Sequence, residues 1–191
     1  MTPRATGALL AVLTSLTAVA QPKSPAQSTA ALPRFEDYAV AEVYKGTPAA
    51  PRIVTPEARS YRTRIREGVT KGVGVFRDVK DEPGPNFAGH YIVVQIMCGS
   101  PCTVMVIVDA QTGIIYDPPI SAGKSGPDKL VLPFVPFDLA KLEFHVNSRL
   151  FEITGCGAES AAVEGCSIYY FLWESNNWKL LRRVPLQQAE R

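Results

Sequence analysis

Two long runs of apolar, mostly β-branched residues lie close together in the middle of the chain. They cover residues 91–97 and 103–109, and a short turn that begins at Cys98 and ends at Cys102 separates them. Because nearly every position is apolar, both faces of each strand are expected to be buried. The runs therefore predict a β-hairpin at the centre of the fold. Its expected register pairs Ile92 with Val108, Val93 with Ile107, Val94 with Val106 and Ile96 with Val104.

A helical pattern precedes the hairpin. Thr55 is a suitable N-cap, Pro56 occupies the first helical position, and Gly68 is expected to end the helix. Apolar residues at spacing i, i+3 and i+7 form a narrow stripe that can pack on a sheet, namely Ala58, Tyr61 and Ile65. The remaining surface carries arginines and predicts a solvated face, with anion binding as the alternative, at Arg59, Arg62, Arg64 and Arg66.

Short strands at hairpin spacing account for most of the remaining chain. They are expected at residues 114–116, 130–134, 142–146, 150–154, 167–173 and 178–184. A turn at 174–177 joins the last two, and residues 35–44 are interpreted as an extended segment. The pattern indicates a mainly β fold, an antiparallel sheet or sandwich of hairpins with one N-terminal α-helix (α+β).

The first twenty residues have the features of a signal peptide. Arg4 supplies the positive charge, an apolar stretch follows, and Ala18 and Ala20 form a small-x-small cleavage site. The apolar stretch is too short to span a bilayer of about 30 Å, so no stable membrane insertion is expected after cleavage. Residues 21–34 are polar and proline-bearing and predict a disordered leader. We therefore expect a single β-rich domain at 35–191 in a periplasmic or secreted protein.

The charge balance is nearly neutral, with 20 basic and 18 acidic residues, and gives no indication of nucleic acid as a partner. The chain has four cysteines, all beyond the expected cleavage site, as is typical of an oxidising compartment. Composition therefore favours an exported protein that contains disulfides.

The cysteines allow three kinds of chemistry. If Cys98 and Cys102 lie opposite each other across the turn, a disulfide fits the distance between paired strands, and Cys156 and Cys166 form the second expected disulfide. A redox pair needs a helix after the first cysteine, whereas a strand follows here. A metal site would need His90 close to the cysteines. About eight residues of strand separate His90 from Cys98 by roughly 26 Å, which is too far for both to bind one metal ion. Disulfides are therefore predicted, with no metal and no cofactor, and the thiol or metal reading stays as an alternative.

Two further groups of residues are candidates for a site. Asn86, His90 and Tyr91 combine an amide, an imidazole and a phenol next to the first strand, where a small hydrolase could use His90 as its base. The alternative is structural, with Asn86 capping a turn and Tyr91 packing in the core. Trp173 and Trp178 flank the last turn, which predicts cross-strand packing or, alternatively, an exposed binding patch.

Three motifs give the chain a resemblance to known sequences. They are the segment 84–91 that contains Asn86 and His90, the Cys98-Gly-x-x-Cys102 spacing, and an Ile-Val-Asp-Ala-x-Thr-Gly stretch at 107–113. The chain resembles a family of small exported bacterial proteins without an assigned activity, and this resemblance implies export and a shared fold. The function predicted here is a non-enzymatic binding or inhibitor-like module of the bacterial envelope, whose partner is an envelope protein or a glycan.

Overall fold

The computed structural model describes residues 31–72, 83–99, 102–119, 130–131, 142–157 and 166–186. The chain divides into two compact units, Met1–Ala31 and Leu32–Arg191, and all the described helices and strands belong to the second unit. The predicted signal peptide and residues 21–30 of the predicted leader lie outside the described residues. Within the described residues, no helix has both the length and the apolar character that crossing a membrane requires.

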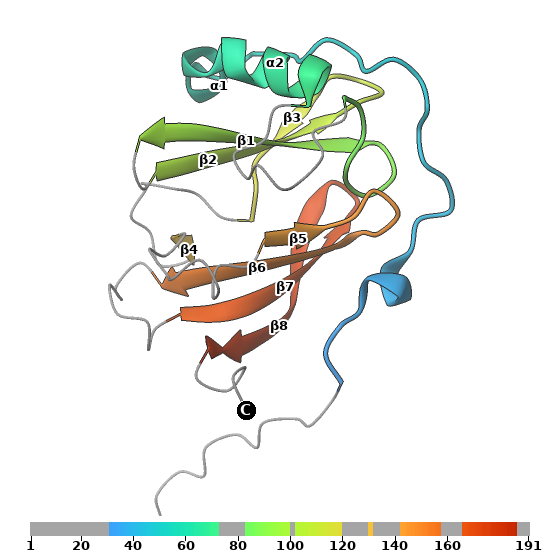
Figure 1. Cartoon of the computed structure of the whole chain (residues 1–191), viewed down its shortest axis with the longest axis vertical. Helices are drawn as coiled ribbons and strands as arrows, with labels where there is room; N and C mark the ends of the chain where they lie inside the picture. The colour runs from blue at the N-terminus through green and yellow to red at the C-terminus, as the bar shows by residue number, and fades with distance from the viewer. Residues whose placement is uncertain are drawn as a thin grey trace, which may run out of the picture. The chain divides into compact units, whose positions relative to one another are not determined.

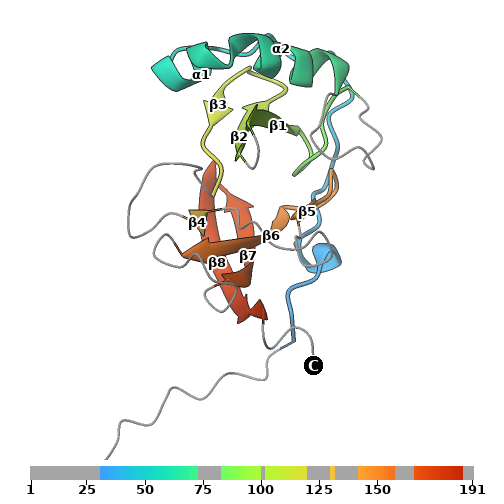
Figure 2. The same ribbon diagram turned by 60° about the vertical axis from the view of Figure 1, so that its left-hand side comes forward.

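Two antiparallel sheets form the second unit, as expected for a mainly β fold (Figure 1). The first sheet has the strand order β1 (Tyr91–Gly99), β2 (Cys102–Asp109) and β3 (Ile115–Tyr116). The second sheet contains β4 (Leu130–Val131), β6 (Leu150–Gly157), β7 (Cys166–Glu174) and β8 (Asn177–Pro185) in that order, and β5 (Leu142–Phe144) also pairs with β6. Helices α1 (Pro56–Ser60) and α2 (Arg62–Lys71) lie over the first sheet, on the side away from the second (Figure 2).

The β1–β2 hairpin has the predicted register, including the pairs Val93 with Ile107 and Ile96 with Val104. The prediction is wrong next to the turn. Met97 pairs with Thr103, the register then shifts, and Gly99 rather than Cys98 stands opposite Cys102. A bulge at this point places an extra residue in β1, and such bulges bend a strand locally. The backbone therefore does not place the two cysteines directly opposite each other.

The predicted helix exists, but it is divided and ends later than expected. Thr55 caps α1 through its hydroxyl, which accepts a hydrogen bond from the Ala58 N–H at 3.1 Å. Gly68 does not end the helix; it lies inside α2, where an added Cβ would collide with the Val94 side chain. Gly72 provides the end, since its left-handed φ of 65° suits the position after a helix. Gly68 therefore permits close packing of α2 on β1.

The first sheet takes part in two cores. The helix-side core contains Ala58, Ile65, Val69, Ile92, Val94, Ile96, Val108 and Ala110. The inter-sheet core fills the space between the two sheets and is rich in aromatic rings, with Phe87, Tyr91, Phe151, Tyr169, Phe171 and Trp173 among its buried members. Successive strand residues point to opposite faces, so β1 and β2 supply alternate side chains to each core.

An N-terminal segment, residues 39–54, runs along the edge of both sheets, and we call it the strap (Figure 1). Residues 35–44 were expected to be extended, but Phe35–Tyr38 form a 3₁₀-helix before the strap begins. Backbone hydrogen bonds fix the strap at four points: the N–H groups of Val40, Tyr44, Ala49 and Arg52 donate to the carbonyls of Asn147, Gly89, Ala110 and Gly113, respectively. Since Asn147 precedes β6 and the other three acceptors flank β1 and β2, the strap joins both sheets.

Candidate functional site

The Asn86 side chain is bound to the backbone of β1. Its Oδ1 accepts a hydrogen bond from the Val93 N–H at 2.7 Å, and its Nδ2 donates to the Val93 carbonyl at 3.2 Å. The amide thus satisfies both backbone groups of Val93 at the edge of the sheet, as a neighbouring strand would. This arrangement gives Asn86 a structural role.

Residues 87–90 connect the strap, the second sheet and the turn after β2. Ala88 has a positive φ of 44°, and its N–H points to the carbonyls of His145 and Ser148. Gly89 donates to Val146 and accepts from Tyr44 of the strap. These backbone hydrogen bonds require the tight turn that follows Phe87. Residues 87–90 therefore position the strap, the second sheet and the turn after β2 relative to one another.

His90 also has a backbone role, because its carbonyl accepts a hydrogen bond from the Ala110 N–H at 2.8 Å. Its imidazole ring lies 4.2 Å from the Tyr91 ring, centroid to centroid, and is half-buried. A cavity between residues 44–48 and the C-terminal end of α2 is lined by other residues. The structure brings Asn86, His90 and Tyr91 together, in the segment that connects the strap, the second sheet and the turn after β2. The hydrolase hypothesis stays untested.

The Tyr91 hydroxyl is the polar end of the inter-sheet core. It donates a hydrogen bond of 2.6 Å to Oδ1 of Asn176, in the turn between β7 and β8. Burial raises the pKa of Tyr91, and the nearby Asp109 carboxylate adds to this effect. The same two causes raise the pKa of Tyr116, whose ring meets the Tyr91 ring edge-on at 6.1 Å. These phenols are therefore held in their neutral form.

Trp173 and Trp178 pair directly across the β7–β8 turn, and their ring centroids are 4.6 Å apart. Ser175 and Asn176 form the turn with positive φ values of 50° and 61°, the conformation that suits a two-residue hairpin. Trp173 is 3% exposed, and Trp178 donates from Nε1 to the Asp117 carbonyl at 2.9 Å. The rings pack across the strands, and Trp173 is too buried to belong to an exposed binding patch.

Cys166 is buried and disulfide-bonded. The backbone register places Cys156 opposite it across β6 and β7. The side chains of Cys98, Cys102 and Cys156 lie outside the described residues, so the predicted connectivity stays a prediction. No group of three or more His, Cys, Asp or Glu side chains among the described residues could hold a metal ion.

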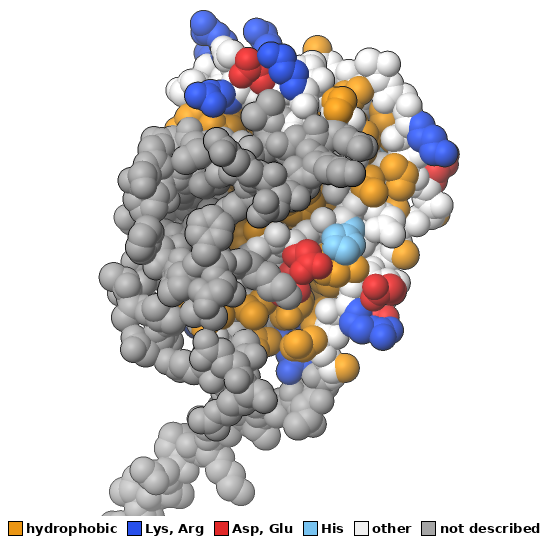
Figure 3. All heavy atoms as spheres, in the orientation of Figure 1, with side chains coloured by type: hydrophobic (Ala, Val, Ile, Leu, Met, Phe, Trp, Pro, Cys, Tyr) orange, Lys and Arg blue, Asp and Glu red, His pale blue; other side chains and the backbone are white. Residues whose placement is uncertain are grey.

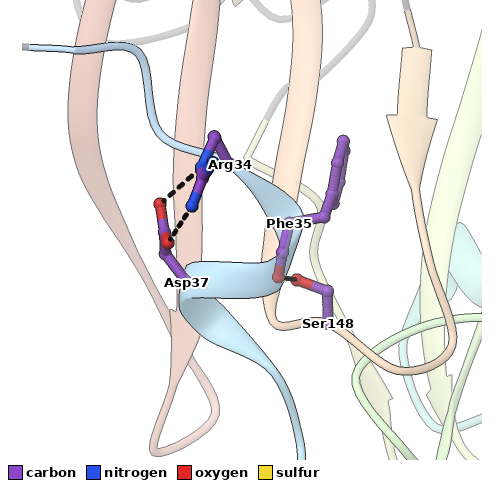
Figure 4. A network of polar contacts seen from close by, with 4 residues as sticks. All are labelled: Arg34, Phe35, Asp37 and Ser148. Atoms are coloured by element: carbon purple, nitrogen blue, oxygen red, sulfur yellow. Dashed lines mark hydrogen bonds and ion pairs between the residues drawn. The ribbon is translucent and has the colours of Figure 1, made fainter.

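The turn before β6 anchors the 3₁₀-helix that precedes the strap. The Ser148 hydroxyl donates to the Phe35 carbonyl at 2.8 Å, and Arg34 contacts both carboxylate oxygens of Asp37 (Figure 4). The hydrogen bond from Arg34 lowers the pKa of Asp37. The Phe35 ring stacks on the ring of His145 at 4.1 Å, with 4° between their planes. These contacts hold the 3₁₀-helix against the second sheet.

A cavity of about 480 Å³ lies between the strap and the C-terminal end of α2. We call it the strap cavity. Its walls are formed by Tyr44, Lys45, Gly46, Thr47, Pro48, Val69, Thr70, Pro83, Gly84 and Pro85. The Tyr44 hydroxyl donates to the Thr47 carbonyl at 3.2 Å, which holds the strap in a turn at this point.

Sequence reasoning missed the strap cavity. Residues 46–51 are irregular in sequence, and the cavity needs three segments that are far apart along the chain. A signal was present in the clustering of prolines at 83–85 and 48–51, because such residues form rigid walls without regular structure. Comparison with known protein families, curated proteins and solved structures finds no match for this chain.

Proposed function

We propose that the protein is an exported, non-enzymatic binding module of the bacterial envelope, and that the strap cavity holds a segment of a partner protein. The cavity carries this proposal because it combines volume with a suitable lining. Ligand sites are typically concave, mostly apolar and provided with few polar groups. In the part of its wall that the structure describes, the strap cavity combines rings and aliphatic groups with nearly as much polar surface, which includes Lys45, Thr47 and Thr70.

The lining favours a peptide segment with an apolar side chain and a nearby carboxylate. Four of the lining residues present rings to the cavity, namely Tyr44, Pro48, Pro83 and Pro85, and the buried Val69 lies behind them. Lys45 is the one charged residue among the described lining residues, and it is exposed. An acidic group on the ligand would pair with its ammonium group, while the apolar part of the ligand would displace water from the rings.

The cavity walls are fixed before a ligand arrives. Val69 is 1% exposed and anchored in the helix-side core, and the Tyr44 N–H is bonded to the Gly89 carbonyl. A preformed site loses less conformational entropy on binding than a mobile one. The strap and α2 therefore provide a rigid frame for the segment that enters.

A photocrosslinking residue placed in the cavity tests this function. We expect p-benzoylphenylalanine at Thr70, on the cavity wall, to give a protein adduct in an envelope extract. The same residue at Thr63, which is exposed on α2 but is not part of the cavity wall, serves as the matched control. An adduct of equal yield at Thr63, or an adduct with glycan alone, would contradict the proposal.

Charge reversal then tests how the segment is recognised. Peptides from the adduct are synthesised, and their affinity is measured by fluorescence anisotropy. Lys45→Glu is expected to weaken binding about ten-fold or more, since an attraction becomes a repulsion. Lys179→Glu, on the exposed strand β8, changes the net charge equally and is expected to have little effect. Equal losses in the two variants would exclude the strap cavity as the site.

A further inference from the structure

We infer that the outer face of α1 and α2 is a docking surface for anionic phospholipid headgroups. This inference concerns a different surface from the strap cavity and does not depend on it. Residues 56–71 contain five basic and two acidic residues, a surplus of three positive charges. The whole chain has a surplus of two, so the positive charge is concentrated on the helical layer. Figure 3 shows blue side chains gathered where Figure 1 places these helices.

The helices pack their apolar side against the first sheet, which leaves the arginines of α2 on the two flanks of its exposed side. Arg62 and Arg66 share one flank, and Arg64, two residues from each, lies on the other. Ile65 and Val69 are buried in the helix-side core, whereas Arg62, Arg64 and Arg66 are exposed. Within the described part of the chain, no carboxylate lies within ion-pair distance of these three guanidinium groups. Their charges are therefore available to a partner.

The arrangement of these arginines has an electrostatic cost. Arg62 and Arg66 are one helical turn apart, and like charges at this spacing destabilise an isolated helix slightly. An ordinary solvated face lowers this cost with acidic residues at the same spacing, as Glu67 does for Lys71 at 3.4 Å. An anion bound beside both arginines would offset this repulsion, because it attracts each of them. Arginine is suited to this role because its planar guanidinium group contacts two phosphate oxygens at once.

An exposed apolar residue beside the arginines favours a membrane surface over a soluble polyanion. Val54 is 69% exposed and immediately precedes the helix cap. The Arg59 guanidinium donates to the Val54 carbonyl at 3.0 Å, which fixes the valine at the edge of the basic face. An interface of lipid headgroups can accept both a cation and a short apolar side chain. The expected mode is peripheral contact without insertion.

Vesicle cosedimentation with the purified full-length protein tests the inference. Binding is expected to vesicles of equal parts phosphatidylglycerol and phosphatidylcholine, and not to phosphatidylcholine alone. The triple variant Arg62→Gln, Arg64→Gln, Arg66→Gln is expected to bind about 100-fold more weakly, from roughly five-fold for each arginine near an anionic surface. The effect should decrease as salt rises, because salt screens exposed charges.

The matched control removes three positive charges elsewhere, through Arg34→Gln, Arg149→Gln and Lys179→Gln. Both variants keep the same N-terminus, so any contribution of that segment to binding cancels. Circular dichroism melting establishes that each variant is folded. Equal losses in the two variants, equal binding to both kinds of vesicle, or full competition by millimolar inorganic phosphate would overturn the inference. Tighter binding to a double-stranded oligonucleotide than to the anionic vesicles would also overturn it.

Discussion

The two cores that share the first sheet differ in what holds them together. In the helix-side core, aliphatic side chains meet closely, and Gly68 lets α2 approach Val94. In the inter-sheet core, large rings meet mainly edge-on, and two polar groups at its boundary have fixed partners: the Tyr91 hydroxyl donates to Asn176, and Trp178 Nε1 donates to the Asp117 carbonyl. One core therefore depends on close fit alone, and the other combines ring packing with directed hydrogen bonds.

The largest difference between the cores should appear on truncation of a fully buried side chain in each. Phe87 and Ile65 are both 0% exposed. The centroid of the Phe87 ring lies 5.5 Å from that of Phe151 and 5.7 Å from that of Trp178. We expect Phe87→Ala to lower the free energy of unfolding by about 4 kcal/mol and Ile65→Ala by about 3 kcal/mol. Urea unfolding followed by far-ultraviolet circular dichroism measures both.

Val54→Ala, at a site that is 69% exposed, is the control and should change the free energy of unfolding by less than about 0.5 kcal/mol. If Phe87→Ala does not fold, Phe87→Leu provides a milder cavity for the same comparison. If Ile65→Ala loses more free energy of unfolding than Phe87→Ala, ring packing in the inter-sheet core does not stabilise the fold more than aliphatic packing in the helix-side core.

A smaller effect, with an unusual sign, is expected where α2 contacts the sheet. Replacing glycine by alanine inside a helix normally stabilises it by about 1 kcal/mol. At Gly68 the new methyl group would collide with Val94, so we expect Gly68→Ala to lower the free energy of unfolding by about 2 kcal/mol. Urea unfolding measures this loss, and Thr63→Ala on the exposed side of α2 should show no loss.

The double variant Gly68→Ala with Val94→Ala sharpens this result. The space that the Val94→Ala change leaves can accept the new methyl group. The double variant should therefore lose less free energy of unfolding than the two single variants lose together. Independent, additive losses would show that the helix does not depend on this close approach.

The smallest effect belongs to the hydroxyl at the end of the inter-sheet core. Tyr91→Phe removes the hydrogen bond to Asn176 and is expected to cost about 1 kcal/mol at neutral pH. The pKa of Tyr91 is raised above its ordinary value of 10.0. Its neutral form therefore contributes stability that is complete below pH 10 and is lost as the pH rises through the folded-state pKa.

Urea unfolding between pH 8 and pH 11 follows this contribution. Tyr91→Phe should make the free energy of unfolding decline less steeply above pH 10. Tyr38→Phe, in the 3₁₀-helix, is the control for the removal of a phenol elsewhere and should leave this decline unchanged. An unchanged alkaline slope in Tyr91→Phe would contradict the assignment of this group to the decline.

The elements with strong local patterns were predictable from the sequence. The β1–β2 register followed from two uninterrupted apolar runs, and a capped helix followed from Thr55 and Pro56. The end of that helix was not predictable from Gly68, because glycine serves equally to end a helix and to bring it close to a sheet. Only the partner, Val94, decides between these uses, and Val94 is remote in sequence.

The candidate sites were less predictable for the same reason. Asn86, His90 and Tyr91 are types of residue that serve in active sites, but here backbone partners occupy Asn86 and the His90 carbonyl. The bulge before the β1–β2 turn changed the position of Cys98 relative to Cys102, since a turn of several residues does not fix its own register. The strap cavity depends on contacts between distant segments, which local patterns do not contain.

The strap has a consequence for the order of folding. It precedes every strand that the structure describes, so it is synthesised before them, yet its acceptors at Gly89, Ala110 and Asn147 belong to segments made later. Contacts between such distant segments form late, because a long loop must close before they yield any stabilisation. The bond from Tyr44 to Gly89 spans 45 residues and the bond from Val40 to Asn147 spans 107, whereas the bond from Tyr91 to Asn176, which joins the two sheets, spans 85. We therefore expect the strap to dock on the first sheet early and to reach the second sheet last.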